Sequence, residues 1–198
     1  MAMTRLLIVS LTVLVVTGCA GSPEPRFYAL QTLEDPTPVA ELPGLGIAIG
    51  PVNLPRYLDE PRIVTRKHES RVEYREYDRW AGGSLESEML RVLGENLGLL
   101  LGTDRVVVYP LRGPFPIKYT VRLDVERFDG RRGDSVDLRT RWVVTAAGQD
   151  DALAVEITEL TAPLEETKTR RLVEAHGKLL GELSRVIAER VAALEPGT

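Results

Sequence analysis

Apolar side chains recur every three or four residues over positions 84–101, which is the pattern of a helix with one buried face. Ser84 is a good N-cap, and Glu86 and Glu88 fall in the first turn, where the helix dipole favours carboxylates. Gly102 is suited to closing the helix at its C-terminus. The apolar stripe comprises Leu85, Met89, Val92, Leu93, Leu97 and Leu100. We therefore predict a helix over this range.

A second amphipathic helix is predicted over about residues 168–194. Its apolar face carries Leu172, Leu179, Leu183, Val186, Ile187, Val191 and Leu194, and its opposite side carries charged residues. His176 lies close to the apolar stripe. A lone histidine in such a position is more often packed at the edge of a core than bound to a ligand, so we expect a structural role for it.

Between residues 117 and 157, apolar and polar residues alternate in three segments, which is typical of strands with one buried and one solvated face. The residues predicted to face the core are Ile117, Tyr119, Val121, Leu123 and Val125, then Val136, Leu138, Thr140, Trp142 and Val144, then Leu153, Val155 and Ile157. Turns are predicted at Asp129-Gly130 with Gly133-Asp134, and at residues 148–151. The three segments predict a meander.

Shorter apolar segments predict five further strands, over residues 26–31, 46–52, 62–66, 71–77 and 105–109. Because a helix separates the second of these strands from the last, the two are expected to pair in parallel through a crossover. Two helices with one apolar stripe each, and a sheet with one apolar face, predict an α+β fold. We expect a two-layer sandwich, with a mostly antiparallel sheet and two main helices packed on one face.

The N-terminus has the features of a secretory signal. Arg5 precedes an apolar run from Leu6 to Val16, which is too short to cross a bilayer, because a spanning helix needs about 20 apolar residues. The run closes at Val16-Thr17-Gly18-Cys19, which contains the only cysteine of the chain. This ending resembles the lipobox of bacterial lipoproteins. The resemblance implies that residues 1–18 are removed and that Cys19 receives an S-diacylglycerol and an N-acyl group.

The mature chain is then expected to consist of a lipidated tether, residues 19–25, and a single α+β domain, residues 26–195. In enterobacterial lipoproteins, an aspartate after the acylated cysteine retains the protein in the inner membrane. Ala20 stands at this position. The lipoprotein resemblance therefore implies attachment to the periplasmic face of the outer membrane.

Charge and motifs restrict the chemistry that can be expected. The formal net charge of −4 argues against a nucleic-acid partner, which usually meets a basic face. His68-Glu69 begins like a zinc-protease motif, but the second histidine would fall at Val72. Ser84 lacks the final glycine of a nucleophile elbow and is explained by helix capping. We predict no catalytic residue, no metal site and no cofactor besides the covalent lipid.

Two features allow both a structural and an interaction role. Trp80 lies just before the helix at 84–101, where it can pack the helix entry onto the sheet or anchor a partner. Gly94, Gly98 and Gly102 lie on one side of that helix. An interior glycine destabilises a helix by about 1 kcal/mol relative to alanine, so its presence needs a reason. Such a side suits close packing within the chain or a contact between subunits, and Gly94 and Gly98 are the candidate subunit-contact residues.

Four blocks of sequence occur in a characteristic order. They are residues 26–30 (Arg-Phe-Tyr-Ala-Leu), residues 49–66 (Ile-Gly-Pro-Val-Asn-Leu-Pro-Arg-Tyr-Leu-Asp-Glu-Pro-Arg-Ile-Val-Thr-Arg), residues 77–81 (Tyr-Asp-Arg-Trp-Ala) and residues 91–97 (Arg-Val-Leu-Gly-Glu-Asn-Leu). This series resembles the ABC-type transport auxiliary lipoproteins, the family of paraquat-inducible protein C and the YmbA-like lipoproteins. The resemblance covers nearly the whole mature chain. In one departure, Gly82-Gly83-Ser84 stands where the family usually continues Glu-Pro-Leu.

The resemblance implies a non-enzymatic component of a lipid transport system. In such systems an inner-membrane transporter works with a periplasmic protein that bears MCE (mammalian cell entry) domains, and the lipoprotein receives the far end of that protein at the outer membrane. Some members form homo-oligomeric rings. The resembling blocks imply Arg56, Tyr57, Asp59, Arg79 and Trp80 as candidate partner contacts. The alternative is a lipoprotein that regulates or scaffolds another envelope machine, such as a peptidoglycan synthase or a secretion pore, although the short tether favours a domain that stays near its membrane.

Overall fold

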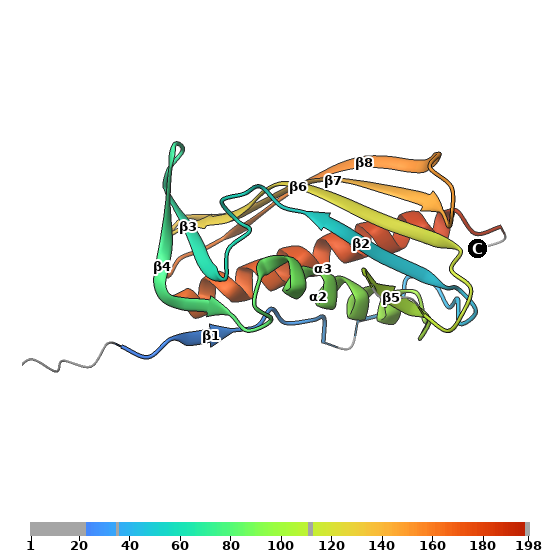
Figure 1. Ribbon diagram of the computed structural model, residues 1–198, viewed down its shortest axis with the longest axis horizontal. Helices are drawn as coiled ribbons and strands as arrows, with labels where there is room; N and C mark the ends of the chain where they lie inside the picture. The colour runs from blue at the N-terminus through green and yellow to red at the C-terminus, as the bar shows by residue number, and fades with distance from the viewer. Residues whose placement is uncertain (1–22, 35, 111–112, 197–198) are drawn as a thin grey trace, which may run out of the picture.

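A sheet of eight strands carries two helices on one of its faces (Figure 1). The computed structural model describes residues 23–34, 36–110 and 113–196. The elements are β1 (Arg26–Tyr28), β2 (Ile47–Asn53), β3 (Arg62–His68), β4 (Arg71–Trp80), α2 (Leu85–Leu100), β5 (Val106–Val108), β6 (Tyr119–Arg131), β7 (Ser135–Ala146), β8 (Ala152–Pro163) and α3 (Thr169–Ala193). This arrangement confirms the predicted α+β class with two main helices.

Parallel and antiparallel pairs are mixed in the sheet. The two longest ladders, β6–β7 and β7–β8, are antiparallel, as is the β3–β4 hairpin. The pairs β1–β4, β2–β5, β2–β6 and β3–β6 are parallel. The predicted crossover through α2 is confirmed by the parallel register of β2 with β5, in which Ile47 lies opposite Val106 and Ile49 opposite Val108.

Helix α2 begins and ends as its sequence predicts. The Ser84 hydroxyl accepts a hydrogen bond from the Ser87 backbone N–H at 3.1 Å, which satisfies one of the free donors of the first turn. Gly102 follows the last turn with a φ of +58°, a conformation that favours glycine. The apolar stripe of α2 is buried along its whole length.

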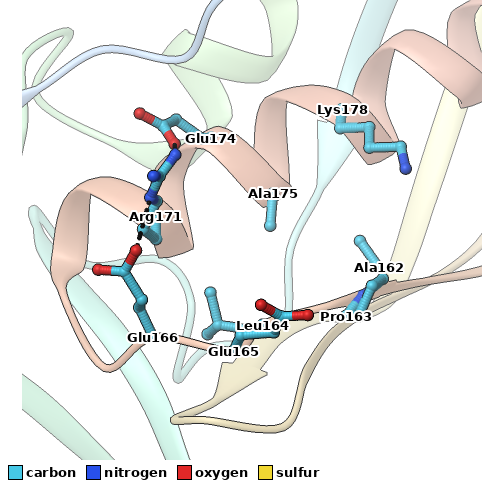
Figure 2. A pocket seen from close by; sticks show the side chains of 9 residues that line it. All are labelled: Ala162, Pro163, Leu164, Glu165, Glu166, Arg171, Glu174, Ala175 and Lys178. Atoms are coloured by element: carbon cyan, nitrogen blue, oxygen red, sulfur yellow. Dashed lines mark hydrogen bonds and ion pairs between the residues drawn. The ribbon is translucent and has the colours of Figure 1, made fainter.

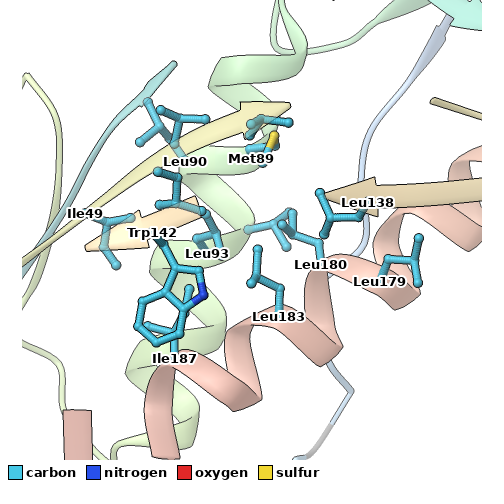
Figure 3. Close-up of a cluster of buried hydrophobic side chains, with 14 of the residues drawn as sticks. Ile49, Met89, Leu90, Leu93, Leu138, Trp142, Leu179, Leu180, Leu183 and Ile187 are labelled. Carbon is cyan, nitrogen blue, oxygen red and sulfur yellow. The ribbon is translucent and has the colours of Figure 1, made fainter. Parts of the chain in front are cut away.

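The core lies between the sheet and the two helices (Figure 3). Ile49 from β2 and Trp142 from β7 meet Leu90 and Leu93 of α2 and Ile187 of α3 in this layer. The Trp142 indole N–H donates to the Thr158 hydroxyl at 2.9 Å, so its one polar atom is satisfied. The prediction that Trp142 is a core residue is confirmed.

Strand β8 faces the opposite way from the prediction. Leu153, Val155 and Ile157 are exposed, and Ala154 and Thr158 are buried in their place. The reason is the register with β7, because Trp142 lies opposite Glu156 and Val144 opposite Ala154. Side chains that lie opposite each other in an antiparallel pair share a face, and the small residues of β8 leave room there for Trp142 and α3.

The end of β6 also differs from the prediction. Asp129 and Gly130 do not form a turn, because β6 continues to Arg131 and the chain reverses only at residues 132–134. A bulge between Val125 and Arg127 shifts the register, so Phe128 and Asp129 are both fully buried. This shift places a carboxylate inside the molecule.

The segment after β1 crosses both helices. The Leu30 backbone N–H donates to the buried Glu88 carboxylate at 2.8 Å, and the Leu33 N–H donates to the Asn96 side-chain oxygen at 2.9 Å. A Cβ atom built on Gly177 would lie 3.3 Å from the carbonyl oxygen of Gln31, so glycine on α3 permits the close approach of this segment. We call residues 29–33 the N-terminal strap.

The buried carboxylate of Asp78 joins three elements. It accepts hydrogen bonds from Arg26 of β1, from Arg75 of β4 and from the Thr169 hydroxyl at the start of α3. Burial opposes ionisation, but these hydrogen bonds and the charge of Arg26 outweigh it and hold the pKa of Asp78 below its ordinary value. The first strand after the tether is thus fixed to the sheet and to α3.

Candidate partner-binding surfaces

The loop between β2 and β3 contains three of the candidate contact residues, and they differ in exposure. Arg56 and Asp59 are exposed, whereas Tyr57 between them is half-buried. The Tyr57 hydroxyl donates to the Asp129 Oδ2 at 2.7 Å. The loop therefore presents Arg56 and Asp59 to solvent and uses Tyr57 to attach itself to β6.

Arg66 completes a buried polar cluster around Asp129. Its guanidinium donates to both oxygens of the Asp129 carboxylate, at 2.9 and 2.8 Å, in the bidentate geometry that arginine favours. Burial works against ionisation of Asp129, but the hydrogen bonds from Arg66 and Tyr57 lower its pKa overall. Burial and the Asp129 carboxylate raise the pKa of Tyr57. The cluster holds a charged pair and a neutral phenol.

Trp80 is a core residue in this structure. Its side chain is only 3% exposed, and its ring lies edge-on to His176 with 6.0 Å between ring centroids. The prediction of Trp80 as a direct partner contact therefore does not fit the structure, in which the ring packs the entry of α2 onto the sheet. Arg79 is partly exposed and lies opposite Phe27 of β1, so it remains a candidate.

His176 of α3 packs against the sheet in the core, in the structural role that was predicted. Its ring lies 4.6 Å from that of Phe128, and its Nδ1 is 2.7 Å from the Leu172 carbonyl oxygen. Burial lowers the pKa of His176, because the charged form is poorly solvated there. The imidazole is therefore neutral.

The glycine side of α2 packs against β5. A Cβ atom built on Gly94 would lie 2.9 Å from Val108 Cγ1, and one built on Gly98 would lie 3.1 Å from the Thr103 carbonyl oxygen. Close packing within the chain therefore explains why these positions lack side chains. The proposed subunit contact at the same side stays a prediction.

An open groove of about 920 Å³ runs along this side, between α2 and β5. Its apolar lining includes Leu90, Leu99, Val106, Val108, Tyr109 and Phe115. Leu99 and Tyr109 are about half exposed, at 47% and 55%. Polar residues such as Arg91, Glu95 and Asp104 occupy its margins. The groove is more apolar than the hollows described below.

A smaller, polar hollow of about 340 Å³ lies where the chain passes from β8 to α3 (Figure 2). Arg171 points between Glu166 and Glu174 and donates to both, at 3.2 and 2.9 Å. Its charge is therefore balanced within the hollow. Leu164 is buried beneath these residues.

An exposed apolar row lies on β8. Leu153, Val155 and Ile157 point away from the helices, and β8 pairs only with β7 among the described strands. This surface was not predicted, because the alternation of apolar residues assigned Leu153, Val155 and Ile157 to the core. The buried positions Ala154, Thr158 and Ala162 carry small side chains, so the pattern of β8 itself gave no signal of its true phase.

Within residues 23–34, 36–110 and 113–196, no group of three or more His, Cys, Asp and Glu side chains is placed to hold a metal ion. None of the described helices is both long and apolar enough to cross a bilayer. Cys19 and the signal of residues 1–18 lie outside the described residues. The lipidation of Cys19 therefore stays a prediction from the sequence.

Comparison with known proteins identifies the family. The family described as "ABC-type transport auxiliary lipoprotein component" matches residues 28–188, so the chain belongs to the ABC-type transport auxiliary lipoproteins. This confirms the resemblance drawn from the sequence blocks. No curated protein matches the chain.

Solved structures share the fold at low sequence identity. A Xanthomonas campestris protein of the DUF330 family is 15% identical, with a TM-score of 0.70 over 85% of this chain and 95% of that protein. An uncharacterized protein is 19% identical, with a TM-score of 0.67 over 85% of this chain and 99% of its own. At these identities the likeness establishes the fold alone.

Proposed function

We propose that the protein is a periplasmic lipoprotein, anchored to the outer membrane, that acts as a non-enzymatic accessory of an MCE-type, ABC-linked system for phospholipid transport between the membranes. The family match over residues 28–188 carries this proposal, because the family is described as an auxiliary component of ABC-type transport. The MCE partner, the transported phospholipid and the outer membrane go beyond that description.

The proposed anchor is the acylated Cys19. One acyl chain holds a protein to a bilayer only marginally, whereas several chains give stable attachment. The first described strand, β1, begins at Arg26, so the folded domain starts seven residues after the lipid. The domain is thereby kept close to the membrane surface.

The proposed partners are an MCE-domain protein and, through it, the inner-membrane transporter subunits. Of the residues implied by the family blocks, Arg56, Asp59 and Arg79 have accessible side chains and are retained as candidate contacts. A homo-oligomeric ring is also proposed, with the Gly94 and Gly98 side of α2 as a candidate subunit contact. The glycines themselves are covered by β5, so such a contact would use the margin of the groove, at Leu99.

The test is affinity purification of the tagged, full-length protein from native membranes in mild detergent, followed by mass spectrometry. We expect an MCE-domain protein and its transporter subunits. The charge-swapped pair Arg56→Glu with Asp59→Arg should reduce their recovery. The matched swap Arg185→Glu with Glu182→Arg, on the solvated side of α3, should leave it unchanged.

Recovery of a peptidoglycan synthase or a secretin in place of the MCE-domain protein would contradict the proposal. It would indicate instead a regulator or scaffold of another envelope machine, since a shared fold does not fix function.

A further inference from the structure

Strands β1, β3 and β4 lie at one end of the molecule (Figure 1). A hollow rich in arginine and tyrosine is formed where these strands meet the turn after β6. It has a volume of about 540 Å³ and is bounded by β1, β3, β4 and the turn after β6. Its lining includes Arg26, Arg62, Arg75, Arg132, Tyr74 and Tyr77. We propose that this hollow, with the neighbouring Phe27, rests on the surface of a bilayer that contains anionic phospholipids. The arginines would donate to the lipid phosphates.

The charge of the hollow suits an anionic surface. Arg132 is exposed and makes no ion pair with another described residue. Arg62 is paired with Glu60 at 3.1 Å, and its guanidinium lies 4.6 Å from the centre of the Tyr74 ring, which holds it at the surface. Planar guanidinium groups donate to phosphate in a bidentate manner, so these two arginines are the strongest candidates for lipid contact.

Carboxylates at the hollow are largely balanced by neighbouring cations. Asp78 is engaged by Arg26 and Arg75, as described above. Glu73 lies 3.5 Å from Lys67 and 3.4 Å from Arg71, both on the same hairpin. Glu76 is exposed. The lining of the hollow contains four arginines, Arg26, Arg62, Arg75 and Arg132, against three carboxylates, Glu73, Glu76 and Asp78. The lining therefore carries a small excess of positive charge in a chain whose formal net charge is −4.

Exposed aromatic rings occur at the same end. Phe27 is 65% exposed, and Tyr74 and Tyr77 are each nearly 40% exposed. Phenylalanine and tyrosine rings at the surface of a soluble domain expose apolar area to water, whereas at a membrane interface the ring enters the headgroup layer and the tyrosine hydroxyl stays hydrated. Basic and aromatic side chains together are the composition that binds an anionic bilayer surface.

The tether brings this end to the membrane. Six residues lie between Cys19 and Arg26, and an extended chain over these seven Cα–Cα steps spans at most about 25 Å. Arg26 is itself fixed to Asp78 at the hollow. The inference rests on the acylation of Cys19 that is part of the proposed function. Given that anchor, β1 and the hollow cannot move far from the lipid headgroups.

This seating would orient the whole domain. The C-terminal end of α3 and the β7–β8 turn lie at the opposite end of the molecule from β1 (Figure 1). They would point into the periplasm, away from the membrane. The lipid alone would leave the domain free to rotate on its tether, so the hollow adds orientation to attachment.

The experiment uses the acylated protein reconstituted into vesicles of phosphatidylethanolamine and phosphatidylglycerol. A Tyr77→Cys variant carries an environment-sensitive fluorophore, and the only other cysteine, Cys19, is blocked by its lipid, which mass spectrometry of the intact protein would confirm. Quenching by lipids that are spin-labelled at the headgroup reports proximity to the surface. We expect quenching at position 77 and little at Leu153→Cys, which lies on β8.

The arginines are then tested by charge reversal in the labelled protein. Arg62→Glu with Arg132→Glu should abolish the excess quenching at position 77, although the lipid still holds the protein on the vesicle. The control pair Arg105→Glu with Arg141→Glu makes the same change in net charge at exposed sites elsewhere. This pair should preserve the excess quenching at position 77. Vesicles of phosphatidylcholine alone should also abolish the excess.

Equal quenching at positions 77 and 153 would overturn the inference, as would quenching at 77 that survives reversal of Arg62 and Arg132, or a Cys19 that carries no acyl group. Quenching at 77 that appears only after a protein partner is added would assign the hollow to that partner and overturn the inference as well. No transport subunit is present in the vesicles, so failure of the proposed transport role would leave this result unaffected.

Discussion

At the scale of single residues, the buried polar side chains decide how the loops attach to the sheet. Tyr57 lies in the block by which the family resemblance was drawn, yet its hydroxyl points inward to Asp129. Asp129 in turn receives Arg66 in bidentate geometry. A carboxylate buried without such partners would cost several kcal/mol, so the three side chains depend on one another.

Replacing Tyr57 with phenylalanine should lower the free energy of unfolding by about 1–3 kcal/mol, because a buried carboxylate oxygen loses a donor. Denaturant titration followed by circular dichroism measures this change. Tyr77→Phe is the matched control, since Tyr77 is exposed and should change stability by less than about 0.5 kcal/mol. Equal effects of the two substitutions would show that the Tyr57 hydroxyl does not stabilise the loop.

His176 should make stability depend on pH. Its pKa is lowered in the folded state, so below the ordinary histidine pKa of about 6.5 the unfolded chain binds a proton that the folded chain does not. The contribution of His176 to the unfolding free energy is therefore expected to be complete above about pH 6.5. The unfolding free energy should fall as the pH is lowered below that value. The charged group that faces the imidazole is Asp129, whose lowered pKa keeps it ionised over this range.

Urea unfolding at a series of pH values between neutrality and mild acidity measures this dependence. His176→Gln should flatten the curve, at some cost in stability, because the amide does not titrate. His68→Gln, at the exposed tip of the β3–β4 hairpin, should leave the curve as it is. A wild-type curve that is flat through this range would contradict the assignment of a neutral, buried imidazole.

At the scale of elements, the spacing of glycines along α2 is compatible with close packing inside the chain and with a contact between subunits. Leucine at position 98 would gain about 1 kcal/mol of helix propensity, but its Cβ would lie 3.1 Å from the Thr103 carbonyl oxygen. Overpacking of this kind costs about 1–3 kcal/mol, so we expect Gly98→Leu to lower the free energy of unfolding overall. Thermal and denaturant unfolding measure the change.

The same substitution cannot by itself test a subunit contact, because it also pushes β5 away from α2. Leu99→Asp changes the margin of the groove without entering the chain's own packing, since the Leu99 side chain is half exposed. If subunits meet at this groove, sedimentation should show a smaller assembly for Leu99→Asp with an unchanged unfolding free energy. A variant that is both stable and of unchanged mass would exclude the groove as the contact.

The elements that the sequence predicts well are those whose signals are local. The N-cap at Ser84, the stripe along α2 and the glycine at position 102 all lie within one helix, and all three are observed. The facing of β8 depends on which residue pairs with Trp142 across the sheet, and that register is not visible in the strand itself. The large apolar side chains of Val155 and Ile157 therefore led to the wrong prediction of which face of β8 is buried.

The candidate site was predictable to a similar extent. Blocks of sequence marked the loop that contains Arg56, Tyr57 and Asp59, but only the fold separates the exposed pair from the half-buried tyrosine. The strand predicted over residues 26–31 ends at Tyr28, and the contacts of the N-terminal strap that follows were not predicted, because its hydrogen bonds to Glu88 and Asn96 join positions about sixty residues apart in the chain. Contacts of that range have no signature in local pattern.

At the scale of the whole molecule, the strap and the Asp78 cluster connect the tether to the core. Glu88 accepts the Leu30 N–H and also the Gly82 N–H, so one buried carboxylate fixes both the strap and the loop before α2. Asn96 accepts from Leu33 and donates to Ser184 of α3 at 3.0 Å. The strap is therefore attached to α2 directly and to α3 through Asn96.

The free edge of the sheet leads to a prediction about assembly. Val155 and Ile157 are 58% and 50% exposed on β8, which pairs with β7 alone among the described strands. An exposed apolar edge offers unsatisfied backbone groups and apolar area to another chain, whereas charged side chains at an edge oppose such pairing. We expect Val155→Lys to reduce self-association of the purified protein in detergent at high concentration, measured by sedimentation velocity.

The same substitution should leave the unfolding free energy within about 0.5 kcal/mol of the wild type, because the side chain makes no core contact. Gln149→Lys, in the exposed turn before β8, adds the same charge and should leave self-association as it is. Persistent self-association in a stable Val155→Lys variant would mean that copies meet elsewhere. The α2–β5 groove, tested by Leu99→Asp, would then be the next surface to examine.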